Sequence, residues 1–310
     1  MKIVLLDSYT INPGDLSFEG LMRLGEVNSY DRTSEEEVKA RIGDADIVIT
    51  VRTAIPNSVL KESINLRFLL IVDTSQSLVD VGYAKECGIT LSYVNPEGDY
   101  SSSQMIFALL LEICHRVQNH SDSARRGDWG VCEDFCYWLS PQIELKDKTM
   151  GIVGDNQASR ITGAIAKTFG MNVIVYSEER SNEDTNYTDI DILIKQSDII
   201  VFSDSSISFK KPLVSKDNIK KMKSGIIILN NSSPKFISEE DLAEALGTGK
   251  VSAAAVDIVS TNPINNDNPL LKARNCLITP RISWATKENR GRILEEISSR
   301  IKDFLGERNS

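Results

Sequence analysis

The sequence has little histidine, no block of basic residues and no long hydrophobic run. Its 310 residues contain only His115 and His120, so a reaction that needs an imidazole has to use one of these two. Lys and Arg number 35 against 44 Asp and Glu, for a net charge of −9, and no cationic cluster offers an electrostatic footprint for nucleic acid or anionic lipid. We therefore expect neither nucleic acid nor a membrane among the partners of this protein.

Apolar runs and cysteines are equally limited. The longest apolar stretch, residues 105–114, is about half of a membrane span and contains Glu112, and the four apolar residues at 3–6 predict a first strand rather than a secretory signal. The cysteine count is odd, which favours a reducing compartment, and we expect a cytoplasmic protein. Cys132 and Cys136 stand four apart, and two thiols in an apolar loop are favoured over a metal or redox pair because no second ligand pair exists. No metal is expected.

Short β-branched segments are abundant, and stretches with helical periodicity lie between most of them. The predicted strands cover residues 2–7, 46–50, 67–74, 89–94, 149–154, 172–177, 198–204, 225–231, 251–259 and 275–282. Continuous apolar strands that alternate with helices are buried on both faces, which indicates parallel sheets with right-handed crossovers. The sequence therefore predicts an α/β protein with two Rossmann-like, doubly wound parallel sheets.

The strands fall into two groups, four before residue 95 and six after residue 148. A helix over 101–119 separates them, with apolar residues at 105, 106, 109, 110, 113 and 117 forming one face. An aromatic-rich arm follows it and should pack either on its own domain or on a second subunit. A final helix over 286–305 can return to the first domain.

The strand at 149–154, the helix after it and the strand at 172–177 form the unit that binds a dinucleotide. Of the three glycines in a G-x-G-x-x-G fingerprint, only Gly154 is present, because Asn156 and Ser159 occupy the other two positions. Asn156 can still form the turn with a positive φ, but its side chain is expected to take space that the diphosphate needs, and Asp155 adds a negative charge there. Ser177 stands where an acid would bind the ribose, with Glu178 next to it. NAD, the cofactor of such a unit, is therefore not expected to bind tightly.

Four segments, residues 6–21, 104–117, 134–154 and 267–288, carry a resemblance that covers essentially the whole chain. With them the chain resembles the D-isomer-specific 2-hydroxyacid dehydrogenases of the glycerate dehydrogenase and hydroxypyruvate reductase type. The resemblance implies a small substrate domain of residues 1–98 plus 286–310 and a nucleotide-binding domain of residues 99–285. It also implies a cleft between the domains and a homodimer built on the nucleotide domain and its arm.

Members of that family reduce a 2-oxo acid with NADH. An Arg binds the carboxylate, and a His whose pKa is held up by a Glu protonates the developing alkoxide. At the matching positions this chain has Ser233, Asn262 and Arg281, while Asp257 keeps the place of a cofactor-binding acid. A guanidinium is not a proton donor at neutral pH. Ordinary 2-oxo acid reduction is therefore predicted to be absent.

Polar residues remain at the positions that would line the implied cleft. The candidate catalytic positions are Arg281, Asn262, Ser233, Asp73 and Asp99, and the candidate ligand contacts are Lys235, Asn231, Ser75, Gln76 and Trp284. The favoured hypothesis is a cleft repurposed to bind or transform a small anionic or zwitterionic metabolite. Two alternatives stay open: a noncatalytic partner or regulatory subunit of an active dehydrogenase, and a residual NAD-dependent 2-hydroxyacid oxidoreductase.

Overall fold

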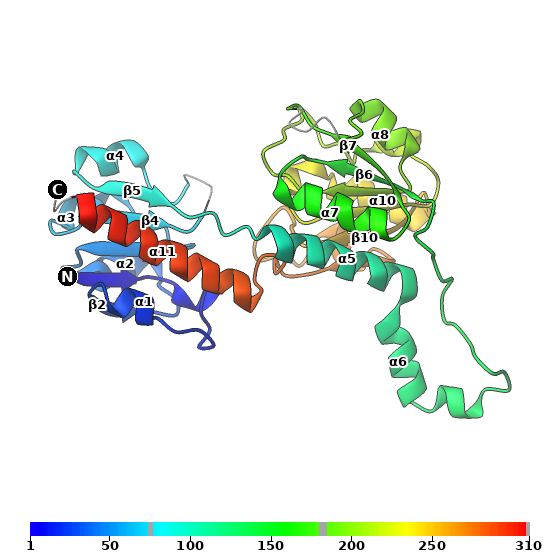
Figure 1. Cartoon of the computed structure of the whole chain (residues 1–310), viewed down its shortest axis with the longest axis horizontal. Coiled ribbons are helices and arrows are strands. Elements are labelled where there is room, and N and C mark those ends of the chain that lie inside the picture. The colour runs from blue at the N-terminus through cyan, green and yellow to red at the C-terminus, as the bar shows by residue number, and fades with distance from the viewer. Residues whose placement is uncertain (74–76, 180–184, 308–310) are drawn as a thin grey trace. The chain divides into compact units, whose positions relative to one another are not determined.

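The computed structural model describes residues 1–73, 77–179 and 185–307 of the chain, and it divides into two compact units (Figure 1). Unit 1 consists of Met1–Glu97 and Trp284–Ser310, and unit 2 of Gly98–Ser283. Each unit is a Rossmann-like α/β body with its own parallel sheet, so the predicted fold class is confirmed. The division lies close to the expected limits at residues 98 and 285, and each unit is described by itself below.

The sheet of unit 1 has five parallel strands in the order β2-β1-β3-β4-β5. The strands are β1 (Lys2–Leu5), β2 (Glu26–Ser29), β3 (Ile47–Thr50), β4 (Phe68–Ile71) and β5 (Thr90–Tyr93). Four of them were predicted, and β2 was missed. It is an edge strand with the sequence EVNS, which contains no apolar run. Val27 is its one half-buried residue, and the other three are exposed.

The helices of unit 1 cover both faces of this sheet, and the longest of them comes from the carboxyl end of the chain. They are α1 (Glu19–Met22), α2 (Val38–Ile42), α3 (Asn57–Glu62), α4 (Val81–Glu86) and α11 (Lys287–Glu307), with short 3-10 turns at Ser8–Thr10 and Glu35–Glu37. Helix α11, predicted at 286–305, buries Ile297 and Ile301 in the same core cluster as Ile3 of β1. Residues from the two ends of the sequence thus share one core.

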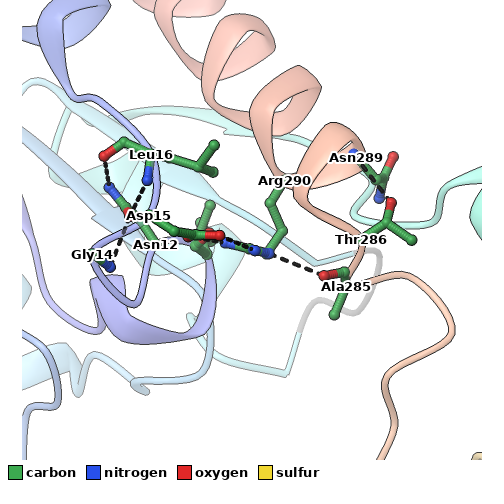
Figure 2. Close-up of polar contacts among 9 residues, drawn as sticks. Asn12, Gly14, Asp15, Leu16, Ala285, Thr286, Asn289 and Arg290 are labelled. Atoms are coloured by element: carbon green, nitrogen blue, oxygen red, sulfur yellow. Dashed lines mark hydrogen bonds and ion pairs between the residues drawn. The ribbon is translucent and has the colours of Figure 1, made fainter.

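Figure 2 shows the polar contacts that fasten the amino end of α11 to the loop after β1. Arg290 makes two parallel bonds of 2.8 Å to the carboxylate of Asp15, and it also donates to the carbonyls of Ile11 and Ala285 at 3.0 Å. The loop itself is closed by Asn12, whose side chain accepts from the N–H groups of Gly14 and Leu16 at 3.0 Å. The neighbouring Asn289 donates to the carbonyls of Pro96 and Trp284 at 2.9 Å. The side-chain amide of Asn289 therefore bonds the backbone next to both segments that connect the two units.

Unit 2 has the six predicted strands, all parallel, in the order β11-β10-β9-β8-β6-β7. They are β6 (Thr149–Val153), β7 (Asn172–Tyr176), β8 (Ile199–Phe202), β9 (Ile226–Asn230), β10 (Val251–Val256) and β11 (Cys276–Ile278). Apolar clusters lie on both faces of the sheet, with Phe202 and Phe236 stacked at 4.9 Å in one and Leu110, Ile152 and Val201 in the other. Each strand ends earlier than predicted, because the polar residues after it turn into loops.

The helices of unit 2 flank this sheet, apart from one that leaves it. They are α5 (Asp99–His115), α6 (Val117–Arg125), α7 (Gln157–Thr168), α8 (Ile190–Gln196), α9 (Lys216–Lys221) and α10 (Glu239–Thr248), with 3-10 turns at Asp128–Val131, Pro234–Phe236 and Pro269–Lys272. The single helix predicted over 101–119 is wrong, because Arg116 adopts a left-handed conformation with φ 47°. Helix α6 therefore departs in a new direction, and residues 117–142, called the arm, project from the sheet of unit 2 (Figure 1).

Candidate functional site

The turn between β6 and α7 depends on a glycine. Gly154 has φ 134°, and a Cβ added there would meet the Cβ of Asp204 at 2.4 Å and the hydroxyl of Ser159 at 2.8 Å. Backbone at this φ, with so little space beside it, accepts only glycine. The chain thus keeps the tight turn from strand into helix that a dinucleotide-binding fold uses.

Asn156 caps α7 instead of forming a glycine-like turn. Its φ is −72°, so the predicted positive φ is wrong. The side-chain oxygen accepts from the N–H of Ser159 at 2.9 Å and from its hydroxyl at 2.8 Å, and the amide donates to the carbonyl of Ser203 at 3.0 Å. Asn is among the strongest N-cap residues, and here the cap also links the end of β6 to the end of β8. Ser203, which the sequence reading missed, completes this link with a 2.7 Å contact between its hydroxyl and that of Ser159.

Asp155 is neutralised inside the unit. Its carboxylate is buried, accepts from Arg160 Nε at 3.1 Å and receives a hydrogen bond from the hydroxyl of Tyr187. The contact with Asp155 also raises the pKa of the Arg160 guanidinium. The negative charge expected beside a diphosphate is therefore compensated by Arg160, at the edge of a cavity of about 200 Å³ along α7.

The start of α7 still fits an anion in part. Among the described residues, the N–H groups of Gln157 and Ala158 have no protein acceptor, as is usual for the first turn of a helix. Ser177 follows β7 directly and is half-buried, while Glu178 is exposed. A nicotinamide dinucleotide would find backbone donors for its diphosphate here, and Glu178 offers a carboxylate just past the end of β7.

The loop after β9 uses its polar side chains to hold itself together. The side-chain amide of Asn230 donates to the carbonyl of Ser233 at 2.8 Å, and the Ser233 hydroxyl accepts from the N–H of Lys235 at 3.4 Å. Asn231 donates to the carbonyl of Ser102 in α5 at 3.2 Å. Ser233 and Asn231 are buried and Lys235 is exposed. Asn230, which was not predicted, organises this loop; its place at the end of a buried strand is the signal that could have found it.

Asp257 organises the turn that carries Arg281. It is 1% exposed, and it accepts from the Thr279 hydroxyl at 2.6 Å, from Ile282 N–H at 2.9 Å and from Ser283 N–H at 2.8 Å. Arg281 lies inside this turn, half-buried and with a left-handed φ of 56°. The acid that the resemblance assigns to cofactor binding thus accepts its hydrogen bonds from the Thr279 hydroxyl and from the N–H groups of Ile282 and Ser283.

The remaining candidates belong to both units. Asp73 of unit 1 is buried and pairs with Arg52 Nη1 at 3.1 Å, whereas Asp99, at the first turn of α5, and Asn262 are exposed. Trp284 belongs to unit 1 and packs against the core cluster that contains α11. Ser75 and Gln76 lie outside the residues that the structure describes.

Both histidines form hydrogen bonds with residues of the arm. His115 contacts the side-chain oxygen of Gln142 at 3.1 Å. His120 bonds the carbonyl of Arg116 through Nδ1 at 2.8 Å and accepts from Leu139 N–H through Nε2 at 2.9 Å. Neither imidazole lies on the strand ends that carry Gly154 and Asp257.

Two kinds of site are not found in the described part of the chain. Within residues 1–73, 77–179 and 185–307, no helix is long and apolar enough to cross a membrane. Over the same residues, no group of three His, Cys, Asp or Glu side chains is arranged to hold a metal ion.

Comparison with known proteins decides the family. Residues 107–283, more than half of the chain, match the model of the D-isomer specific 2-hydroxyacid dehydrogenase, NAD binding domain. The chain belongs to this family. It is 46% identical over 312 aligned residues to a hydroxypyruvate reductase from Blautia hydrogenotrophica, with 98% of this chain and 97% of the relative covered.

Solved structures of low identity share the fold of this family member. The pyruvate reductase of Chlamydomonas reinhardtii matches with a TM-score of 0.83 at 18% identity, over 99% of this chain and 96% of that one. An NAD-dependent formate dehydrogenase from Staphylococcus aureus, solved in complex with NAD, matches with a TM-score of 0.79 at 20% identity, over 99% and 95%.

Proposed function

We propose that the protein is an oxidoreductase that moves a hydride between a nicotinamide cofactor and a small 2-oxo or 2-hydroxy acid of the hydroxypyruvate type. The observation that carries this proposal is the 46% identity, over nearly the whole of both chains, with the Blautia hydroxypyruvate reductase. This likeness favours NAD-dependent chemistry, the last of the alternatives left open by the sequence, over a repurposed site.

The chain's own residues have distinct parts in this proposal. Gly154, Gln157 and Ala158 would hold the diphosphate of the cofactor, which supplies the hydride when bound. Arg281 carries a fixed positive charge suited to the substrate carboxylate. Ser233, Asn262 and Arg281 do not titrate near neutral pH, so the proton for the product hydroxyl comes from solvent. We therefore expect turnover without the titration of an imidazole between about pH 6 and pH 8.

The test is a turnover assay with NADH or NADPH and with hydroxypyruvate, glyoxylate or pyruvate. The expected result is cofactor oxidation above the blank, a flat pH profile, and a KM raised roughly tenfold or more in Arg281→Ala. Arg274→Ala, which removes an exposed arginine a few residues away, is the matched control and should leave KM unchanged. If neither cofactor is oxidised with any of the three acids, the proposal fails.

A second candidate is a family member that binds a small anionic or zwitterionic metabolite without reducing it. What favours it is that the resemblance matches Ser233, Asn262 and Arg281 to the catalytic Arg, Glu and His of the family. In that case the metabolite binds and no cofactor is oxidised. Ser233→Arg, Asn262→Glu and Arg281→His together should then give only weak turnover, because Asn156 still caps α7 where the family has glycine. A noncatalytic partner of an active dehydrogenase would instead co-purify with that enzyme from native cells.

A further inference from the structure

A cavity of about 510 Å³ opens at the carboxyl ends of β1, β2 and β3 in unit 1. It is lined by the ring of Tyr9 and by five charged side chains, those of Asp7, Asp31, Arg32, Glu35 and Arg52. Its volume falls within the range of small-molecule sites, roughly 300–1,000 Å³. All of the lining residues belong to unit 1.

The cavity lies where the strand order reverses. The chain runs from β1 to β2 on one side and then to β3 on the other, and open parallel sheets bind ligands at the carboxyl ends of strands at such a point. In unit 2 the corresponding reversal lies between β6 and β8, where Asn156 and Ser159 bond Ser203 across the gap. Unit 1 has a cavity at its own reversal point.

Two of the charges that line the cavity already have partners. The carboxylate of Asp7 is buried and accepts from the N–H groups of Val51 at 2.8 Å and Thr53 at 2.9 Å, as well as from that of Arg52. The guanidinium of Arg52 pairs with Asp73 at 3.1 Å. These bonds fix the end of β3 against β1.

Three other charges lack an ion pair within the described residues: Arg32, Asp31 and Glu35. All three come from the short segment that follows β2. The Arg32 guanidinium lies 4.3 Å from the centre of the Tyr9 ring, which is itself 45% exposed. One cation and two carboxylates are therefore presented together, none of them in an ion pair with another described residue.

The segment that carries these charges is held in place by its neighbours. Arg41 donates to the carbonyl of Arg32 and, at 2.7 Å, to the hydroxyl of Thr33, and it lies 4.4 Å from the centre of the Tyr30 ring. The Thr33 hydroxyl donates in turn to the carbonyl of Leu6. A site whose loop is ordered in advance loses less conformational entropy when a ligand binds.

We propose that this cavity binds a free α-amino acid, with its carboxylate on Arg32 and its ammonium group between Asp31 and Glu35. The charges that form no ion pair match the two ends of a zwitterion, and a carboxylate with an arginine is a strong, directional pair. Because the uncompensated carboxylates outnumber the cation by one, a basic amino acid such as arginine or lysine complements the cavity best. The proposal goes beyond the oxidoreductase function and does not rest on it.

The test is calorimetric titration of the full chain, without nicotinamide cofactor, by L-arginine, L-lysine, L-serine, propionate and butylamine. Arginine and lysine should bind most tightly, serine more weakly, and the probes with a single charged group weakest. Arg32→Ala should weaken arginine binding roughly tenfold or more, and Glu35→Gln should reduce the preference for arginine over serine. Arg23→Ala, an exposed arginine outside the cavity that pairs with Glu19, is the matched control and should bind as the parent protein does.

Three results would overturn the proposal. The first is the absence of heat and of a melting shift with every amino acid. The second is an Arg32→Ala variant that melts like the parent and binds arginine equally well. The third is propionate binding as tightly as arginine, which would leave an anion site without amino-acid recognition. Turnover with NADH plays no part in these outcomes, so failure here and failure of the oxidoreductase proposal are distinguishable.

Discussion

Three buried carboxylates of the two units are committed to bonds within their own unit. Asp155 pairs with Arg160, Asp73 pairs with Arg52, and Asp257 accepts three hydrogen bonds from the turn at residues 279–283. A buried charge without such partners is costly, so each of these acids sits among donors. The bonds of Asp257 hold the turn that carries Arg281, and the bond of Asp155 to Arg160 lies at the start of α7.

Asp257→Asn should destabilise the fold while leaving its shape almost unchanged. One carboxylate oxygen becomes an NH₂ group, which cannot accept a hydrogen bond from the backbone N–H that it faces. The residue is only 1% exposed, so water cannot take the place of the lost acceptor. An unsatisfied buried donor costs about 1–3 kcal/mol. Urea unfolding should show this loss of unfolding free energy. The control is the reverse substitution at an exposed position, Asn262→Asp, which should leave the unfolding free energy unchanged. Equal unfolding free energies for Asp257→Asn and the parent would show that the turn does not depend on the carboxylate.

The five thiols should differ in reactivity. Burial raises the pKa of Cys114 to about 11 and that of Cys276 to about 12, so the thiolate of each is rare at about pH 8. Cys87 and Cys136 are exposed. Iodoacetamide at that pH should label Cys87 and Cys136 first, and all five should react in urea, as followed by peptide mass spectrometry. Early labelling of Cys276 in the folded protein would contradict this order.

At the scale of elements, α11 depends on a single buried arginine. Arg290 closes two bonds on Asp15 and two on backbone carbonyls, which ties the helix to the loop after β1 (Figure 2). The hydrogen bond from Arg290 holds the pKa of the Asp15 carboxyl below its usual range. The pair should therefore stabilise the fold when Asp15 is ionised.

Asp15→Asn should lower the melting temperature by a few degrees near neutral pH. Because the pKa of Asp15 is depressed in the folded protein, its contribution is complete above the ordinary value of about 4. It is lost as the pH falls through the lower folded value, so the two melting curves should converge in acid. Scanning fluorimetry from about pH 7 to pH 3 measures this. Glu19→Gln, which breaks an exposed pair with Arg23 at 3.8 Å, should change little at any pH. A constant difference for Asp15→Asn in acid would rule out the ion pair as its cause.

Elements with buried apolar runs could be predicted from the sequence, and those without could not. All six strands of unit 2 follow from such runs, whereas β2 has too polar a sequence to be recognised. No glycine or proline marks the break between the two helices at Arg116. The left-handed conformation of this arginine results from the packing of α5 and the arm. Within the site, the identities at Asn156 and Asp257 were visible, but their bonds to Ser203 and to the 279–283 turn depend on strand ends far apart in sequence.

At the scale of the molecule, the arm presents apolar side chains that nothing in unit 2 covers. They include Trp129 at 55%, Val131 at 84%, Phe135 at 93% and Trp138 at 68% exposure. A projecting surface of this kind is typical of a contact with another protein, and a second copy of the chain is the partner that we expect.

Val131→Asp together with Phe135→Asp should therefore convert the expected homodimer into a monomer. The added charges would have to be desolvated in the contact, which disfavours association. Light scattering after size exclusion gives the mass directly. Ile64→Asp, at a 90% exposed apolar residue of unit 1, is the matched control and should keep the parent mass. A parent protein that is already monomeric would refute the dimer.

The way that α11 completes unit 1 has a consequence during synthesis on the ribosome. Residues 1–97 emerge first, yet Ile293, Ile297 and Ile301, which fill the same core as Ile3 and Leu5, are translated only after the whole of unit 2. Unit 2 is continuous in sequence, so it can fold before α11, the last helix of unit 1, has been synthesised. The nascent amino-terminal segment should accordingly remain sensitive to protease until translation has passed α11, and should then become resistant together with the carboxyl end.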